Sequence, residues 1–542
     1  MKALVRVFVV MGAIAASVGL GPLGSPAGAA PDTRVFMVAD SVALGAASAV
    51  HAALAGRDVS IVGHQGIFTS DAAELAWAHR DEIGATAIVG TGYNYPVWNP
   101  PLFDGWIDQM MTRLTDAGAK HVFWLTLREP PLGEHDIVSV WEQNHIADHY
   151  PGANDQLRAA TARWPQLVLA DWNAASRGGG LTWDGLHLTP AGAAAMADLL
   201  ADEIDGVGRL AAGATLRVPV APGAPAAALN VTVTWPRAAG FLTVWPCDQP
   251  RPVASNLNYV RHQTVANLAI TRLAADGSAC VYASQDAHVL VDLEGTFAAS
   301  AGLETVNPAR VLDTRTAGAA PPAGSTMRVA PGVPAGSRAV IATVTATEAA
   351  GPGFVTAWPC DQPRPTASSL NYGPGGTVAG LAIVPLAADG SFCLFTMASA
   401  HLVADVAGWF TATATLAPVA PSRLADTRTT AGRLGPGGVL AVTAPAGAAA
   451  VAVTVTAADP GGPGYLTAYP CGGSPPVAST LNYLAGVATA NLALVGVGAG
   501  GQICVTSFAA SDVVVDLAAS VPAGVGYTAA GPVRLADTRP AQ

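Results

Sequence analysis

The sequence is short of charge, and of lysine above all. Charged residues make up only 12% of 542, and Lys2 and Lys120 are the two lysines. The formal net charge is −11 and there is no basic run, so neither nucleic acid nor an anionic lipid surface is expected as a partner. Glycine (59) and proline (41) are plentiful, yet 51% of the residues are hydrophobic, which argues against a disordered chain.

Several cofactor motifs are also missing. Neither a G-x-G-x-x-G nor a P-loop pattern occurs within 31–206, so no nucleotide cofactor is expected, and the chain has no C-x-x-C or H-E-x-x-H. One group of side chains could still hold a metal: Glu134, His135, His145 and His149. A solvated helix face explains these residues better, so the prediction is no metal and no other cofactor.

Residues 1–30 have the features of a secretory signal peptide. Two early positive charges precede an apolar stretch from Val7 to Leu20, and small residues precede Pro31. A membrane anchor is the alternative, but the apolar stretch is shorter than the roughly 20 residues of a span. No later stretch is long and apolar enough. We therefore predict a secreted, extracellular protein without a transmembrane segment; attachment to the cell surface stays open.

The six cysteines reveal a repeat. They form pairs 33 residues apart, and the first cysteines of successive pairs are separated by 113 and then 111 residues. The flanking sequences agree: FLTVWPCDQPRPVASNLNY, FVTAWPCDQPRPTASSLNY and YLTAYPCGGSPPVASTLNY. Because an exported chain meets an oxidising compartment, three disulfides within the repeats are predicted: Cys247–Cys280, Cys360–Cys393 and Cys471–Cys504.

The chain therefore divides into an N-terminal domain and an all-β region. The domain, 31–206, holds 8 of the 12 tryptophans and no cysteine. Alternating Val/Thr runs between glycines and prolines predict short antiparallel strands in three repeats, at 212–305, 306–418 and 419–542. Their aromatic residues form either a glycan-binding face or the repeat cores, and core packing is the more common use; the residues concerned are Trp245, Tyr259, Trp358 and Tyr372.

A D-T-R motif occurs three times, at 313–315, 426–428 and 537–539, and the third copy has no repeat after it. Either the terminal segment belongs to the first repeat, so that the β region closes on itself, or each motif belongs to the repeat before it and the repeats form a row. Closure, which would avoid free sheet edges, is favoured because the leftover motif lies where a closing strand would have to come from.

The N-terminal domain alternates strand-like and helix-like segments. Buried parallel strands are predicted at 35–40, 59–63, 86–92, 121–127 and 167–172, and helices at 43–54, 70–81, 104–117, 154–164 and 190–204. This alternation predicts an α/β doubly wound sheet, whose active site lies at the carboxyl ends of the strands.

Four polar residues stand at such positions. Ser41 directly follows the first strand and precedes a helix, whose first N–H groups could stabilise an oxyanion. Asn94 follows the third strand, in GTGYN, and Asp184 and His187 lie in WDGLHLTP before the last helix. A carboxylate three residues before a histidine can hold the imidazole in the tautomer that deprotonates a serine. The nearby aromatic residues Tyr93, Tyr95 and Trp98 either wall a pocket or pack in the core.

These segments resemble the blocks of the SGNH (GDSL-type) hydrolases: VADSVALG, GTGYN and DGLHLTPAG, within about 34–205. The resemblance implies a flavodoxin-like three-layer fold, with Ser41 as nucleophile, His187 as base and Asp184 as its partner. It also implies an oxyanion hole of the Ser41 N–H, Asn94 and a glycine after the second strand, for which Gly66 is chosen over Gly63. Ala39 departs from the family pattern, where glycine is usual.

The function expected from this resemblance is hydrolysis of a carboxylic ester by a secreted serine esterase or deacylase. A glycan O-acyl group, a lipid ester or a small acyl ester all remain open as substrate, as does acyl transfer. The D-T-R repeats are similar to those of exported actinobacterial proteins and are expected to contact a cell wall or polysaccharide. The alternative is a surface-binding or adhesive protein with an inactive hydrolase-like domain.

Overall fold

A computed structural model describes residues 32–96, 98–129, 149–177, 179–430, 432–524 and 526–539. They form two compact units that divide between Leu200 and Ala201. The predicted signal peptide and the residues Glu134, His135 and His145 lie outside the described ranges. Among the helices in those ranges, none has both the length and the apolar character needed to cross a membrane.

The first unit is built on a parallel sheet in the order β2-β1-β3-β4-β5, the flavodoxin-like order. Each strand begins and ends within two residues of the predicted apolar run. The three central strands are almost wholly buried because helices flank the sheet, whereas the two edge strands are partly exposed. The strands are β1 (Arg34–Ala39), β2 (Asp58–Gly63), β3 (Thr86–Gly90), β4 (His121–Leu125) and β5 (Leu167–Ala170).

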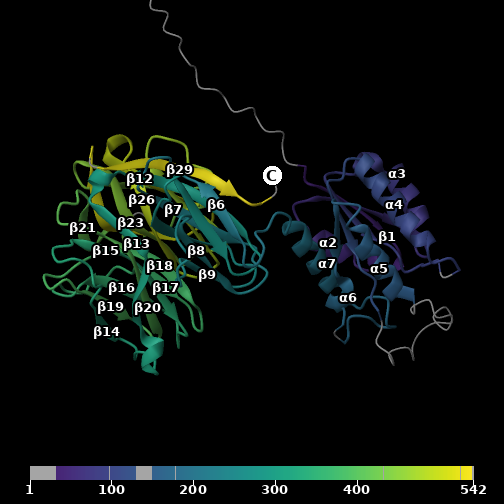
Figure 1. Cartoon of the computed structure of the whole chain (residues 1–542), viewed down its shortest axis with the longest axis horizontal. Coiled ribbons are helices and arrows are strands. Elements are labelled where there is room, and N and C mark those ends of the chain that lie inside the picture. Colours follow the sequence, from purple (N-terminus) through teal and green to yellow (C-terminus); the bar gives the residue numbers. More distant parts are fainter. Residues whose placement is uncertain are drawn as a thin grey trace, which may run out of the picture. The chain divides into compact units, whose positions relative to one another are not determined.

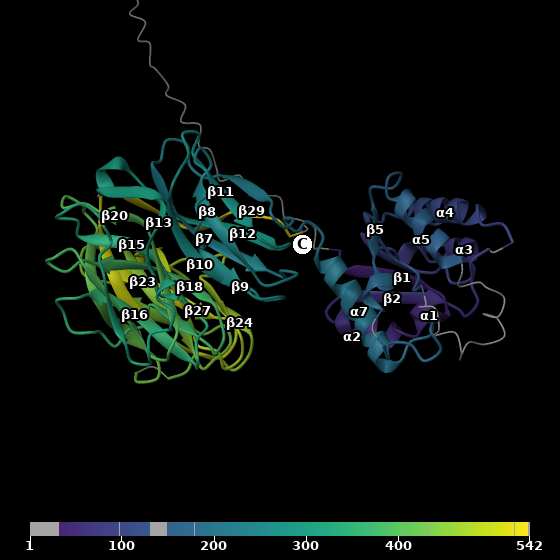
Figure 2. The same cartoon turned by 60° about the horizontal axis from the view of Figure 1, so that its bottom comes forward.

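Helices cover both faces of this sheet. Figure 2 shows α3, α4 and α5 on one side of the strands and α1, α2 and α7 on the other. The helices are α1 (Ser41–Leu44), α2 (Ala47–Ala53), α3 (Thr69–Ala78), α4 (Leu102–Asp116), α5 (Tyr150–Ala160), α6 (Trp172–Ala175) and α7 (Pro190–Asp205). Helix α7 begins as its sequence predicts, since Pro190 is its first residue and the Thr189 hydroxyl accepts the Gly192 N–H at 3.1 Å.

The helix predicted over 43–54 is wrong in one respect, because the chain forms two short helices, α1 and α2, in its place. The break lies at Gly45, where a Cβ atom would come within 3.0 Å of the Val42 carbonyl oxygen and 3.8 Å of the Leu188 side chain. Because glycine has no Cβ, the chain after Ser41 can turn at Gly45 and still lie close to Leu188, the residue after His187.

The second unit consists of six four-stranded sheets, two to a module. In the first module, β6-β11-β8-β9 is one sheet and β10-β7-β12-β29 the other. The same order recurs in β14-β19-β16-β17 with β18-β15-β20-β13, and in β22-β27-β24-β25 with β26-β23-β28-β21. All pairings are antiparallel, in line with the predicted all-β repeats.

The strands have the following bounds. Those of the first module are β6 (Thr215–Pro219), β7 (Ala226–Thr234), β8 (Gly240–Pro246), β9 (Leu257–Tyr259), β10 (Val265–Arg272), β11 (Ser278–Ala283), β12 (His288–Phe297) and β29 (Tyr527–Asp537). Those of the second are β13 (Leu303–Asp313), β14 (Thr326–Val329), β15 (Ala339–Thr347), β16 (Gly353–Pro359), β17 (Leu370–Tyr372), β18 (Val378–Pro385), β19 (Phe392–Thr396) and β20 (His401–Phe410). Those of the third are β21 (Ala417–Asp426), β22 (Val439–Thr443), β23 (Ala448–Ala458), β24 (Gly464–Pro470), β25 (Leu481–Tyr483), β26 (Thr489–Gly496), β27 (Gln502–Ser507) and β28 (Asp512–Pro522).

Each module has its own core, and the three modules share a further one. Along β7, Ala227, Leu229 and Val231 point between the two sheets of the module. Ala226 and Ala228 point the other way, into a cluster that also receives residues of the second and third modules. Successive side chains of a strand point to opposite faces, so alternate apolar residues of β7 contribute to the module's own core and to the core shared by the three modules. Trp245, Tyr259, Trp358 and Tyr372 are all buried, so they do not form the exposed glycan-binding face considered above.

The three predicted disulfides are present. Each joins the residue after one strand to the neighbouring strand of the same sheet, with Cα atoms 5.0 Å apart: Cys247–Cys280, Cys360–Cys393 and Cys471–Cys504. None of the described cysteines is free.

The last strand closes the β region. Strand β29 pairs with β12, with Leu290 opposite Asp537 and Phe297 opposite Tyr527, and Figure 1 shows this yellow strand among the teal strands of the first module. The assignment of 527–537 to the third repeat is therefore wrong, because this segment is the edge strand of the sheet β10-β7-β12-β29 in the first module. A row of separate repeats is excluded for the same reason.

The D-T-R motifs have a structural role. Each threonine hydroxyl accepts a backbone N–H near the start of the adjacent strand: Thr314 from Leu402, Thr427 from Val513 and Thr538 from Val289, all at 2.9 Å. Each aspartate takes two hydrogen bonds from the side chain of its arginine, as Asp537 does from Arg539 at 2.9 and 2.7 Å. The motif therefore fastens one edge strand of each module, β29, β13 or β21, to the neighbouring strand of its sheet.

Candidate active site

A hydrogen-bonded chain of side chains links Ser41, His187 and Asp184. The Ser41 Oγ lies 3.3 Å from His187 Nε2, and His187 Nδ1 lies 2.7 Å from Asp184 Oδ2. The other carboxylate oxygen of Asp184 accepts the backbone N–H groups of Leu186 at 2.9 Å and His187 at 2.6 Å. A hydroxyl, an imidazole and a carboxylate are thus linked in series, although Ser41 and His187 are 146 residues apart in the chain.

The residue before Ser41 shapes the turn that presents it. Asp40 is fully buried, and its carboxylate accepts the N–H groups of Val42 at 3.0 Å and Ala43 at 3.4 Å. The Ser41 N–H has no such acceptor among the residues that the structure describes. Of the amides of Ser41, Val42 and Ala43, the one next to the serine hydroxyl is therefore left without an acceptor in the described residues.

Burial also changes the acidity of Asp40. Desolvation raises the pKa of its carboxyl to about 6, against the opposing effect of the N–H groups of Ala43, Val42 and Tyr93 and the charge of His187. No role for Asp40 is predicted from the sequence. An aspartate directly before a serine at a strand end, with two N–H groups within reach, is the pattern of a helix N-cap and could have revealed it.

Asn94 lies after β3, which is paired with β1 in the sheet. Its Nδ2 donates to the Ile67 carbonyl oxygen at 3.0 Å, and Ile67 belongs to the loop after β2. That bond fixes the amide and uses one of its two hydrogens. Ser41, Asn94 and the loop after β2 therefore meet at the carboxyl ends of three adjacent strands, where the chain order of the sheet reverses.

Gly63 and Gly66 differ in what they are needed for. Gly63 ends β2 opposite Ala39, and a Cβ atom at Gly63 would lie 1.9 Å from the Ala39 carbonyl oxygen, so close packing of the strands accounts for it. Gly66 is exposed, with φ +75°, and nothing lies within 4 Å of the position of its Cβ. Its N–H has no backbone or side-chain acceptor in the described part of the chain, which leaves it available to a ligand.

Arg128, which the sequence analysis missed, holds the loop that carries Asp184 and His187. It is 3% exposed, and its Nη1 donates to the Gly185 carbonyl oxygen at 2.7 Å while its Nε donates to that of Ser176 at 3.2 Å. Its backbone N–H donates to the Tyr93 hydroxyl at 2.9 Å. A lone arginine three residues after a strand carries no sequence signal, because its partners are backbone carbonyl groups distant in the chain.

The aromatic residues around the site fall into two groups. Tyr93 and Tyr95 are buried, so they pack in the core, and the ring of His149 stacks on Tyr95 with centroids 5.9 Å apart. Trp98 and Trp183 are 65% and 61% exposed, and the indole of Trp183 stacks on the imidazole of His187 at 5.5 Å. The exposed indole of Trp183 therefore lies beside His187, whereas that of Trp98 contacts Phe68, with ring centroids 5.6 Å apart.

Among the described residues, no cluster of three or more His, Cys, Asp or Glu side chains has the spacing of a metal site.

No known protein-family model and no curated protein matches the sequence. Solved structures do match about a third of the chain. The catalytic domain of peptidoglycan O-acetyltransferase A from Streptococcus pneumoniae is 23% identical, with a TM-score of 0.24, over 31% of this chain and 90% of that one. A lipase/acylhydrolase from Enterococcus faecalis is 18% identical, with a TM-score of 0.26, over 32% of this chain and 95% of that one. A family 3 carbohydrate esterase from Clostridium thermocellum is 13% identical, with a TM-score of 0.24, over 31% of this chain and 92% of that one. The function proposed below rests on the geometry of the site.

Proposed function

We propose that this protein is an exported serine esterase of the SGNH type that cleaves a carboxylic ester. One observation carries the proposal: a serine hydroxyl, an imidazole and a carboxylate are linked by contacts of 3.3 and 2.7 Å at the carboxyl end of a parallel sheet. In this proposal Ser41 is the nucleophile, His187 the general base and Asp184 the residue that orients it.

The first chemical step follows from these roles. His187 Nε2 takes the proton of the Ser41 hydroxyl as Oγ forms a bond to the ester carbonyl carbon, and the C=O electron pair moves onto oxygen. The tetrahedral intermediate then collapses, the bond to the alkoxy group breaks, and His187 returns its proton to the leaving alcohol. Water, activated by the same imidazole, releases the acyl group from Ser41.

The negative oxygen of the intermediate needs hydrogen-bond donors. The N–H groups of Ser41 and Gly66 and the second amide hydrogen of Asn94 are the donors proposed here, since each is without an acceptor or has one hydrogen to spare. Such donors are pre-oriented in the protein, and therefore lower the barrier at little reorganisation cost.

The β region is proposed to attach the enzyme to a polymer or to the cell surface, where its ester would be found. A glycan O-acyl group, a lipid ester and a small acyl ester are all substrates of the proposed chemistry, and an alcohol in place of water would make the reaction an acyl transfer.

The test is hydrolysis of a chromogenic acetyl ester by the full chain. We expect Ser41→Ala and His187→Ala each to reduce turnover to background, because each removes a group that forms or breaks a bond. Ser48→Ala and His51→Ala are matched controls, since both residues are exposed on α2, and they should leave the rate unchanged. Full activity of Ser41→Ala would refute the proposed nucleophile. If the wild-type chain cleaved no ester, a binding protein with an inactive hydrolase-like domain would replace the proposal.

A further inference from the structure

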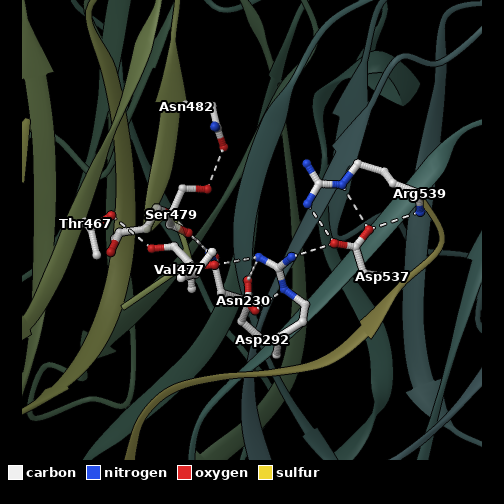
Figure 3. Close-up of polar contacts among 11 residues, drawn as sticks. Asn230, Asp292, Thr467, Val477, Ser479, Asn482, Asp537 and Arg539 are labelled. Carbon is white, nitrogen blue, oxygen red and sulfur yellow. Dashed lines mark hydrogen bonds and ion pairs between the residues drawn. The ribbon is translucent and has the colours of Figure 1, made fainter. Parts of the chain in front are cut away.

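A cleft lies between the first and third β modules, far along the chain from the proposed active site. Its volume is about 220 Å³, and its walls come from β7 and β29 on one side and the segment before β25 on the other. Clefts for drug-sized ligands measure roughly 300–1,000 Å³, so this one fits a smaller unit. Figure 3 shows Arg539 beside Asp537 and Asn482 beside Ser479.

The charges in the cleft cancel. Arg534 is paired with Asp292, and it also donates to Asp537 at 2.8 Å. Arg539 is paired with the same Asp537 at 2.7 Å, so the two arginines and two carboxylates form a neutral network. The residues from 206 onward also balance, with 16 arginines and 16 acidic residues. Neither an anionic nor a cationic ligand is favoured by net charge.

Three polar groups in the cleft have hydrogen-bonding capacity to spare. Arg539 uses Nε and Nη2 on Asp537, and its Nη1 has no acceptor in the described part of the chain. Asn482 accepts from the Ser479 hydroxyl at 3.1 Å, which orients the amide and leaves its Nδ2 hydrogens unused. The Thr232 hydroxyl is without a partner although this residue is only 2% exposed. A buried, unsatisfied hydroxyl is uncommon and is usually satisfied by a water or a ligand.

An apolar surface completes the cleft. The ring of Tyr465 is 38% exposed and is stacked on Phe508, with centroids 5.1 Å apart and planes at 26°. Val477 is 94% exposed at the edge of the cleft. Planar amide and guanidinium donors beside an aromatic face suit a sugar ring, which presents hydroxyl groups at its rim and C–H groups on its faces.

The same groups recur between the other modules. The D-T-R arginines Arg315 and Arg428 repeat the geometry of Arg539, each with Nε and Nη2 on its aspartate. Asn258 and Asn371 accept from Ser255 and Ser368 at 3.0 and 3.1 Å, as Asn482 does from Ser479. The Thr456 hydroxyl, which corresponds to that of Thr232, is also unpartnered. Strands of neighbouring modules are in contact at each boundary, namely β10 with β13, β16 with β21 and β24 with β29.

We propose that the closed β body binds a neutral polysaccharide through this cleft and through the corresponding groups at the other two module boundaries, each position taking one sugar unit. The inference rests on the attachment role proposed above but not on ester hydrolysis. Because the three positions are fixed in one body, a long polymer can occupy two or three at once, and the second contact is then intramolecular. Weak single sites can therefore give firm attachment, with a gain of roughly 10²–10⁴ in apparent affinity.

The experiment measures retention of the full chain on insoluble cellulose, chitin and α-glucan, with polygalacturonate as the anionic arm. We expect binding to at least one neutral polymer and not to polygalacturonate. Asn482→Ala should weaken this binding several-fold, and the triple variant Asn258→Ala, Asn371→Ala, Asn482→Ala should weaken it at least 100-fold. Each of these amides accepts only a neighbouring serine hydroxyl, so an unchanged thermal unfolding midpoint checks that the variants are folded.

Two controls separate this inference from the proposed esterase. Gln362→Ala removes an exposed amide outside these three positions and should bind as the wild type does. Ser41→Ala should bind normally even when it is inactive, while the triple variant should still cleave a small soluble ester. The proposal is overturned if the wild-type chain binds none of the neutral polymers, if it binds only polygalacturonate, or if the triple variant binds undiminished.

Discussion

The backbone N–H groups around Ser41 fall into two classes: those that already donate a hydrogen bond within the protein and those that do not. In the proposed mechanism, only an N–H group of the second class can donate to a substrate. The carboxylate of Asp40 takes the N–H groups of Val42 and Ala43, while the Ser41 N–H is left without an acceptor in the described residues. Asn94 is held by a single bond to Ile67, so its side chain is oriented before a substrate arrives. The donors of the proposed oxyanion hole are thus in place at no further conformational cost.

Removal of the Asn94 amide tests this arrangement. We expect Asn94→Ala to lower kcat about 10²–10³-fold with little change in KM, because one donor to the developing oxyanion is lost. Asn99→Ala is the matched control, since Asn99 is exposed a few residues further along the chain and should have no effect. Steady-state kinetics on an acetyl ester provide the measurement, and a wild-type kcat in Asn94→Ala would exclude it from the oxyanion hole.

At the scale of single elements, β29 shows how a terminal segment completes a distant module. It pairs with β12, and Thr538 accepts the Val289 N–H at 2.9 Å while Arg534 pairs with buried Asp292. In the other two modules the equivalent strand, β13 or β21, precedes the rest of its own module. The first module therefore depends on residues more than 200 positions away.

A chain that ends at Ala530 lacks most of this strand. We expect the amides of β12 to lose hydrogen-exchange protection, because β12 becomes an edge strand and the buried carboxylate of Asp292 is exposed to water. The amides of β24 and β27 in the third module should change little. A chain that ends at Pro540 is the control and should match the wild type. Loss of protection confined to the third module would contradict the closed arrangement.

Over the whole β body, buried polar groups join the modules at their shared core. Asn267 of the first module accepts the Leu381 N–H of the second at 3.2 Å, and Asn491 of the third accepts that of Leu268 at 3.2 Å. Glu294, which is 3% exposed, accepts the Leu494 N–H at 2.7 Å. The corresponding residues of the other modules are Ala407 and Ala518. Burial raises the pKa of Glu294 to about 8, against the opposing effect of the Leu494 N–H.

This shifted pKa predicts that the β body loses stability as the pH rises. Unfolded Glu294 ionises near its usual pKa of 4.5, whereas the folded protein keeps the proton up to about pH 8. Between these values the unfolded state binds fewer protons, so each pH unit lowers the free energy of unfolding by up to about 1.4 kcal/mol. The slope falls as the folded carboxyl begins to ionise near pH 8, so the loss from pH 6 to 8 is roughly 2 kcal/mol. Glu294→Gln keeps an acceptor for Leu494 and should abolish this dependence.

Denaturant unfolding at pH 6, 7 and 8 checks the effect. The transition of the β body is the one that shifts when the disulfides are reduced, since all six cysteines belong to it. Glu304→Ala is the control, because Glu304 is exposed and should leave the pH dependence as in the wild type. Equal slopes in the wild type and Glu294→Gln would show that Glu294 is ionised in the folded protein.

Local patterns in the sequence were enough to predict the strands of the parallel sheet, the three repeats and their disulfides, because alternation, apolar runs and cysteine spacing act over short stretches of chain. They also identified Ser41, Asn94, Asp184 and His187 as candidates, since parallel strands bring their carboxyl ends to one edge. The break of the helix at Gly45, the role of Arg128 and the raised pKa of Glu294 depended on neighbours remote in sequence. The sequence left two arrangements of the repeats open, a closed body and a row, and the pairing of β29 with β12 distinguishes them. The sequence alone could not do so, because an edge strand is stabilised by whichever strand lies beside it in space.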